Sequence, residues 1–340
     1  MLYIVIGFLW LSICLYLLFG GADFGAGIVE LLTFNKKDKR EIRQIMDSTM
    51  GPVWEANHMW LIIFIVIMFV GFPQMYSLMS TYNHIPLILM LLGVIARGTS
   101  YTFRHYDVIN DNWEKLYSQI FIYASFLTPL FLGIVAGSAV SGSINTHPNN
   151  FLEGYVYSWL TPFNISVGIF TSACCAYLAA IYAIKDVANE SATQIVLIRK
   201  AKQMMLFVIL SAILVFGVGM YSKLPIINWI YNSPIGTVSV LLSILCMCLV
   251  YFSLVKNKFN FIRFLAASQI GLFLIAGTEG HYPYLIYLKD GSSMSLLKDH
   301  GGDAAIYYLG WALIWGSCLI LPFLIYLIIA FSKKKATVAH

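Results

Sequence analysis

The sequence predicts an all-α polytopic membrane protein with nine transmembrane helices. Of its 340 residues, 59% are hydrophobic and only 11% are charged, whereas soluble globular proteins carry about 45–50% apolar and about 25% charged residues. The mean hydropathy is +0.78. The apolar stretches are long and continuous, which indicates membrane helices rather than the short alternating strands of a barrel. This composition excludes a soluble enzyme, a disordered chain and an ordinary nucleic-acid-binding module.

Each predicted helix is an apolar stretch of about 20 residues, the length that crosses a bilayer. The first stretch has no basic segment before it and no small-residue cleavage site after it, so we interpret it as a retained span rather than a signal peptide. We treat the chain, residues 1–340, as a single integral membrane domain. In order, the nine stretches are residues 2–22, 58–79, 85–102, 117–140, 162–184, 204–222, 235–255, 262–285 and 304–331.

The spacing of these stretches is compatible with an internal repeat. Residues 1–140 hold the first four helices and residues 155–285 the second four, so we predict two four-helix bundles, with 304–331 as an extra ninth helix. The longest connection, about 141–161, is rich in Asn, Pro and Gly and is predicted to be an irregular surface loop. No connection is long enough for an extramembrane domain with its own core.

The basic residues predict the orientation of the helices. The chain has 21 Lys and Arg against 16 Asp and Glu, a net charge of +5. With nine spans, most basic residues fall in connections on one side of the membrane, and only Lys223, Lys289 and Lys298 fall on the other. The positive-inside rule then places the N-terminus outside and the C-terminus in the cytoplasm. The net charge therefore reflects orientation, and we expect membrane lipid but no nucleic acid as a partner.

Cysteine and histidine give no sign of a metal or haem site on this chain. All six cysteines lie inside apolar stretches without a CxxC pair, where free Cys behaves as a small buried hydrophobe. Only His58 and His281 lie near hydrocarbon, and the helix order places them toward opposite faces of the membrane. We therefore expect no catalytic residue, no metal ligand and no cofactor-binding residue here.

A few charged residues inside the apolar stretches are the strongest functional signal, because such charges are costly in a bilayer. A helical rise of about 1.5 Å per residue places Asp23, Glu55 and Arg97 in one zone near the cytoplasmic side. Two interpretations stay open. Arg97 forms a structural ion pair with Asp23 or Glu55, or the acids form a titratable site in a proton or ion path. Glu30, two turns beyond Asp23 on the same face, is predicted to be a solvated interfacial charge.

Two segments identify a resemblance to a known family. The run GGADFGAGIVELL at 20–32, whose small residues favour close helix packing, and the run GPVWEANHMWLI at 51–62 resemble the signature segments of subunit II of cytochrome bd-type quinol oxidases. The resemblance covers essentially the whole chain. One departure is that many members have Asp-Gly where this chain has Glu55-Ala56, which keeps the carboxylate but lengthens its side chain.

The resemblance implies an accessory subunit of a terminal quinol:O2 oxidoreductase in the prokaryotic cytoplasmic membrane. It implies a heterodimer with subunit I, which carries the quinol site, b-type haems and haem d, while subunit II stabilises it and contributes to proton and O2 access. Whether the partner holds haem d or only b-type haems, and whether a small single-helix subunit is present, stays open. The implied proton-path residues are Glu55, Asp23, Arg97, His58 and Asn57, and the implied O2-access residue is Trp60.

Two other functions remain alternatives. A secondary transporter or ion channel would use the Asp/Glu/Arg cluster as its coupling site. Transporters, however, break their helices at the bilayer midplane, whereas the Gly-rich and Pro-bearing segments 20–27 and 51–52 lie toward the cytoplasmic end. In a purely structural scaffold, the acids would only pair with Arg97.

Overall fold

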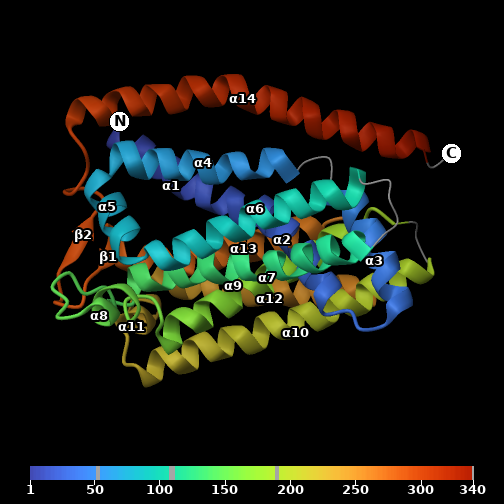
Figure 1. Ribbon diagram of the computed structural model, residues 1–340, viewed down its shortest axis with the longest axis horizontal. Coiled ribbons are helices and arrows are strands. Elements are labelled where there is room, and N and C mark those ends of the chain that lie inside the picture. Colours follow the sequence, from blue (N-terminus) through green and yellow to red (C-terminus); the bar gives the residue numbers. More distant parts are fainter. Residues whose placement is uncertain (51–53, 107–111, 188–190, 339–340) are drawn as a thin grey trace.

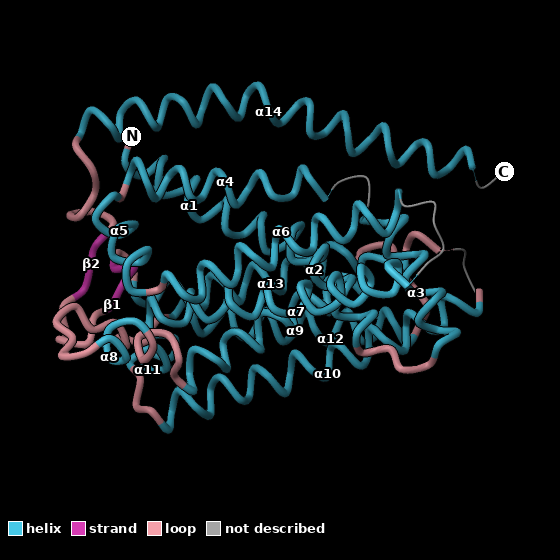
Figure 2. The backbone as a smooth tube through the Cα atoms, in the orientation of Figure 1, coloured by secondary structure: helices cyan, strands magenta, loops and turns pink. Residues whose placement is uncertain are grey.

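The structure is a computed structural model that describes residues 1–50, 54–106, 112–187 and 191–338. Long helices run along the long axis of the molecule, and one two-stranded sheet lies at one end (Figure 1, Figure 2). The helices are α1 (Leu2–Leu15), the π-helical η1 (Tyr16–Gly20), α2 (Gly21–Leu31), α3 (Lys36–Met50), α4 (Trp54–Gly71), α5 (Pro73–Tyr82), α6 (His84–Tyr106), α7 (Asn112–Val140), α8 (Phe151–Tyr155), α9 (Pro162–Ile184), α10 (Ala192–Tyr221), α11 (Pro225–Asn232), α12 (Pro234–Val255), α13 (Ile262–Thr278), the 3-10 helix η2 (Glu279–His281) and α14 (Asp303–Val338), and the strands are β1 (Tyr284–Tyr287) and β2 (Ser293–Ser295).

The prediction of an all-α polytopic membrane protein is confirmed. Among the described residues, eight helical segments are long and apolar enough to cross a membrane, or up to nine if one bent pair counts as a span. That pair is α4 with α5, and the chain bends by 114° between the two helices. A straight helix over 58–79 is therefore wrong: α4 ends at Gly71, and Pro73, which lacks a backbone N–H, begins a new helix. The count of nine and the orientation stay predictions.

The structure differs from the predicted boundaries in several places. The sixth helix, α10, begins at Ala192 rather than at residue 204, and it ends at Tyr221. The first span is a continuous helical run of 30 residues, Leu2–Leu31, rather than 2–22, and it contains the π-helical turn η1. The eighth helix ends at Thr278 instead of continuing to residue 285, because the chain turns through η2 into β1. The connection about 141–161 contains a short helix, α8, whose N-terminus is capped by Asn150.

Short polar side chains and prolines start several long helices. The Thr161 hydroxyl accepts from the Asn164 N–H at the start of α9, and the Ser191 hydroxyl caps α10 in the same way. Proline follows the cap in α9 and α12, where its missing N–H costs nothing. These caps fix where the helices begin, and the apolar stretches fix how far they run.

The core is formed where α2 and α9 pack against each other, with α7 beside both. The small residues of α2 allow this approach, as predicted from the run at 20–27. A Cβ atom added at Gly25 would lie 1.9 Å from the backbone oxygen of Cys175, so only glycine fits. The predicted ninth helix, α14, packs against α1 and α4. The arrangement in two four-helix bundles stays a prediction.

The connections that the positive-inside rule predicts to lie outside are found together at one end of the molecule. The elements α5, α8, α11 and the β1–β2 hairpin lie together at the end where the chain begins, and α3 lies at the other end (Figure 1). Residues Ile144 and Leu288 form a β-bridge that joins two of these connections. The acidic and basic side chains discussed below lie between α2, α3, α4, α6 and α7.

Candidate functional site

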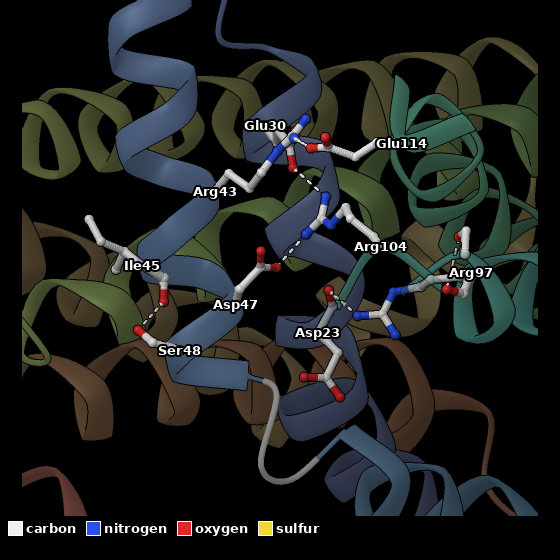
Figure 3. A network of polar contacts seen from close by, with 10 residues as sticks. Asp23, Glu30, Arg43, Ile45, Asp47, Ser48, Arg97, Arg104 and Glu114 are labelled. Atoms are coloured by element: carbon white, nitrogen blue, oxygen red, sulfur yellow. Dashed lines mark hydrogen bonds and ion pairs between the residues drawn. The ribbon is translucent and has the colours of Figure 1, made fainter. Parts of the chain in front are cut away.

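Asp23 is the centre of the site and is completely buried in α2. The Asn57 side-chain amide, on α4, donates to Asp23 Oδ2 at 2.6 Å. Arg97, on α6, donates through Nη2 to the backbone oxygen of Asp23 at 2.8 Å, not to its carboxylate. Figure 3 shows the Asp23 carboxylate pointing away from the Arg97 guanidinium. The structure therefore brings Asp23, Asn57 and Arg97 together, but without the direct ion pair.

Aromatic rings surround the buried cation. The guanidinium carbon of Arg97, which is 3% exposed, lies 5.1 Å from the ring centre of Phe24 and 5.2 Å from that of Phe121. Such contacts stabilise a cation that has left water. They help to explain how Arg97 is held in the interior with one hydrogen bond to a backbone carbonyl.

The remaining residues implied by the resemblance lie on α4. The His58 ring lies 5.9 Å from that of Phe24 and 6.2 Å from that of Tyr16. Trp60 is buried in a small apolar cluster with the same two aromatic residues. These positions place both side chains beside the Asp23 site. Pro52 lies outside the described residues.

Glu55 is the implied residue that the structure places apart from this cluster. It is exposed on the surface of the chain at the start of α4, and among the described residues no ion pair joins it to Arg97. The physical reason is helical geometry, since residues two apart point to nearly opposite sides of a helix. Asn57 faces Asp23, so Glu55 faces outward.

The structure overturns the expectation for Glu30. This residue is 2% exposed rather than solvated, and two arginines bind its carboxylate. Arg43, on α3, donates from Nε at 2.9 Å, and Arg104, on α6, donates from Nη1 at 3.2 Å. Arg104 also donates to the Asp47 carboxylate (Figure 3). The sequence signal for this site is the position of Glu30 on the same helix face as Asp23. Its two arginine partners give no such signal, because the positive-inside rule already accounts for basic residues in these connections.

The two histidines near hydrocarbon belong to different clusters. His281, in η2, is buried and its ring lies 5.4 Å from that of Trp229 on α11. The neighbouring Glu279 accepts a hydrogen bond from the Ser233 hydroxyl. The six cysteines are free thiols. The expectation that this chain ligates no haem stays a prediction.

The geometry favours proton chemistry at Asp23. The hydrogen bond to this carboxylate and the nearby cation favour its ionised form, whereas desolvation by burial favours its protonated form. Within the described residues, Asp23 Oδ1 has no hydrogen-bond partner. Asp23 therefore has one oxygen fixed by Asn57 and a second oxygen able to take or give a proton.

Known proteins resemble the chain along most of its length. The family model for cytochrome bd terminal oxidase subunit II matches residues 1–331. The chain is 26% identical over 207 residues to cytochrome bd ubiquinol oxidase subunit 2 of Bacillus subtilis, covering 58% of this chain and 56% of the relative. It is 25% identical over 175 residues to cytochrome bd-I ubiquinol oxidase subunit 2 of Escherichia coli K12, covering 49% and 45%. The chain thus spans about half the length of these curated relatives.

A solved structure extends the likeness in fold. The bd oxidase from Geobacillus thermodenitrificans contains a chain that superposes with a TM-score of 0.77 at 21% identity, over 97% of this chain and 98% of that one. At this identity the match supports the fold alone. The family match, in contrast, covers residues 1–331, which include both signature segments and the Asp23 site. The chain therefore belongs to the cytochrome bd terminal oxidase subunit II family.

Proposed function

We propose that this chain is the accessory membrane subunit of a bd-type quinol:O2 oxidoreductase. Its partner is a haem-bearing subunit I, which this chain stabilises, and the complex oxidises quinol and reduces O2 to water in a prokaryotic cell membrane. The family match over residues 1–331 carries this proposal, and the names of the curated relatives agree with it. The same match favours an oxidase subunit over a transporter or channel.

The chemistry of the complex gives the buried acid a task. Reduction of O2 to water consumes four protons for each O2. If those protons come from the cytoplasm while quinol releases its protons outside, charge is separated across the membrane without a pump. A protonatable group at membrane depth is then required, and Asp23 lies in the 30-residue apolar run Leu2–Leu31.

The residues around Asp23 have distinct roles in this proposal. Asp23 takes up and releases the proton, and Asn57 orients the carboxylate through its 2.6 Å hydrogen bond. Arg97 fixes the backbone of α2 at this position and adds a positive charge that favours the ionised acid. Exposed Glu55 is a second carboxylate, at the surface of α4, where it meets lipid or the partner. Trp60 and His58 line the adjoining apolar region, the candidate route for O2.

The test uses the intact complex purified with its partner subunit. Asp23→Asn keeps the size and hydrogen bonding of the side chain but removes the titratable group, and Glu55→Gln does the same at the surface. We expect both variants to retain the haem spectrum and to slow quinol oxidation, Asp23→Asn by about a hundredfold, the lower end of the range for loss of a proton-transfer group. Asp290→Asn, an exposed acid that bonds to Ser292 at the other end, is the matched control.

Three results would contradict parts of the proposal. Normal turnover in both variants with full assembly would support the scaffold interpretation. Loss of haem in either variant would show that the acid is structural. A b- or d-type haem spectrum from this chain expressed alone would show that the haems do not reside only in the partner. Finally, the absence of any haem-bearing membrane subunit after gentle purification of the chain would contradict the oxidase assignment itself.

A further inference from the structure

Two layers of polar groups line the contact between α2, α6 and α7. The inner layer is Asp23, Arg97 and Ser125, and the outer layer is Glu30, Arg104 and Ser118. On each helix the two members are seven residues apart, which is two turns and places them on the same face, about 10 Å apart along the axis. All six residues are buried or nearly so. A matched pair of polar layers on three helices requires an explanation beyond helix packing.

Contacts along α7 fix this register. Glu114, at its start, lies 3.7 Å from Arg43. Phe121, two turns further, contacts the guanidinium groups of both layers: its ring centre lies 5.2 Å from Arg97 Cζ and 4.3 Å from Arg104 Cζ. Ser125, one turn beyond, faces α2 at Gly27, where an added Cβ atom would lie 2.3 Å from the Ser125 hydroxyl oxygen. Gly27 itself lies between Asp23 and Glu30 on α2.

The polar atoms between the two layers are unsatisfied by protein groups. Within the described residues, Asp23 Oδ1, the hydroxyls of Ser118 and Ser125, and the Nε atoms of Arg97 and Arg104 are all buried and have no hydrogen-bond partner. A buried polar group without a partner destabilises the fold, and buried water molecules usually supply the missing hydrogen bond. Five such atoms in two neighbouring polar layers are the observation from which water is inferred at this helix contact.

We propose that ordered water joins the two layers into a proton route from Glu30 to Asp23, with the Ser118 and Ser125 hydroxyls as its relays. This inference rests on the proposed function, because it names how protons reach the Asp23 carboxyl. The route begins at the end of the molecule where α3 lies, at the half-exposed Glu114 and the Glu30 carboxylate (Figure 3). It runs inside this chain, beside Phe121.

The structure explains why serine and glycine are required there. A serine hydroxyl both donates and accepts a hydrogen bond, so it passes a proton along a water chain without a change of charge. Gly27 lets the Ser125 hydroxyl approach the backbone of α2, because a Cβ atom at residue 27 would lie 2.3 Å from the hydroxyl oxygen. Arg104 pairs with Glu30 and Arg97 lies beside Asp23, but neither holds a transferable proton, because guanidinium stays protonated in proteins. Protons therefore pass through the hydroxyls and water rather than through Arg97 or Arg104.

The test removes the hydroxyls without disturbing the ion pairs. The double variant Ser118→Ala/Ser125→Ala deletes two oxygen atoms that bond to no described protein group, and alanine is a good helix former. In the purified complex, we expect quinol oxidation about tenfold slower, a change of about 1.4 kcal/mol in the barrier, with an unchanged haem spectrum. We also expect a larger solvent isotope effect in D2O, because proton delivery becomes rate-limiting. A packing role for the serines would move neither rate nor isotope effect.

Ser138→Ala is the matched control on the same helix, since Ser138 is fully buried but donates to the backbone oxygen of Val135. Normal turnover and a normal isotope effect in the assembled double variant would overturn the route. If the double variant does not assemble, each single variant carries the test with a smaller reduction. Slow turnover in Asp23→Asn with normal serine variants would refute the route alone, whereas normal turnover in all of them would also refute the role of Asp23.

Discussion

The contact between α2 and α9 makes Gly25→Ala a strong test of the packing. The added methyl carbon would lie 1.9 Å from the Cys175 backbone oxygen and 2.7 Å from the Ala179 Cβ atom. To restore ordinary contact at about 3.5 Å, the two helices would have to separate by about 1.5 Å. The obstructing atom belongs to a helix backbone, so no side-chain rotation relieves the clash.

We expect Gly25→Ala to lower the free energy of unfolding by about 1–3 kcal/mol, the usual cost of overpacking a core. The upper part of this range applies, because α9 must move as a body. The measurement is the thermal midpoint of the purified complex in detergent, followed by haem absorbance and by activity. Asp23 is two residues away, so the shift of α2 is expected to reduce quinol oxidation as well.

Gly7→Ala is the matched control in the same apolar run. No atom lies within 4 Å of a Cβ added at Gly7, and alanine is favoured over glycine in helices by about 0.5–1 kcal/mol. We therefore expect the thermal midpoint of Gly7→Ala to be at least as high as that of the unchanged protein. Equal midpoints for Gly25→Ala and Gly7→Ala would refute the close approach of α2 and α9.

Two further predictions concern charged groups. Arg104→Met is expected to lower the free energy of unfolding by about 3–5 kcal/mol, because it leaves the buried Glu30 carboxylate with one arginine fewer. Arg43→Met should lower the thermal midpoint less, because the Arg43 side chain is 27% exposed. Equal losses in the two variants would contradict this difference in burial. At the other end, the hydrogen bond from Lys289 holds the pKa of the Glu153 carboxyl below its usual value. The Glu153–Lys289 pair then stabilises its loop fully at pH values above the ordinary glutamate pKa of about 4.3. This stabilisation is lost as the pH falls through the lowered pKa of Glu153. Hydrogen exchange at the residue 289 amide, which bonds to Ile144, should report that loss. Lys289→Met should weaken the pH dependence, because the hydrogen bonds from Asn145 and Asn149 to Glu153 remain.

Hydropathy predicted the membrane helices well because each one is a local property of the chain. Where the helices end depends on single residues and on contacts, which explains the errors. The break between α4 and α5 follows from Pro73, yet the apolar stretch continues through it. The run Leu2–Leu31 extends past residue 22, where Gly25 packs against α9 and Arg97 donates to the backbone oxygen of Asp23. The β1–β2 hairpin has no comparable local signal.

The candidate site was predicted in part. Asp23 and Arg97 were placed at one depth from helix counting alone, and the structure brings them together. The partner from α4 is Asn57 rather than Glu55, because the rotation of that helix is set by packing. The buried Glu30 could not be recognised from the sequence. Its arginines lie 13 and 74 residues away and converge only when α3 and α6 fold against α2.

A double-mutant cycle measures how strongly the Asp23 and Arg97 side chains are coupled in stability. The Glu30–Arg104 contact is a direct ion pair at 3.2 Å, whereas Arg97 holds only the backbone oxygen of Asp23, which Asp23→Asn leaves in place.

We therefore expect the coupling in stability between Asp23→Asn and Arg97→Met to be smaller than that between Glu30→Gln and Arg104→Met, within the range of about 0.5–3 kcal/mol found for interacting residues. Thermal midpoints of the four single and two double variants measure both couplings in the same complex. A coupling at Asp23–Arg97 as large as that at Glu30–Arg104 would mean that the carboxylate is retained for stability. A small coupling together with slow turnover in Asp23→Asn would leave proton transfer as the reason for burying this acid.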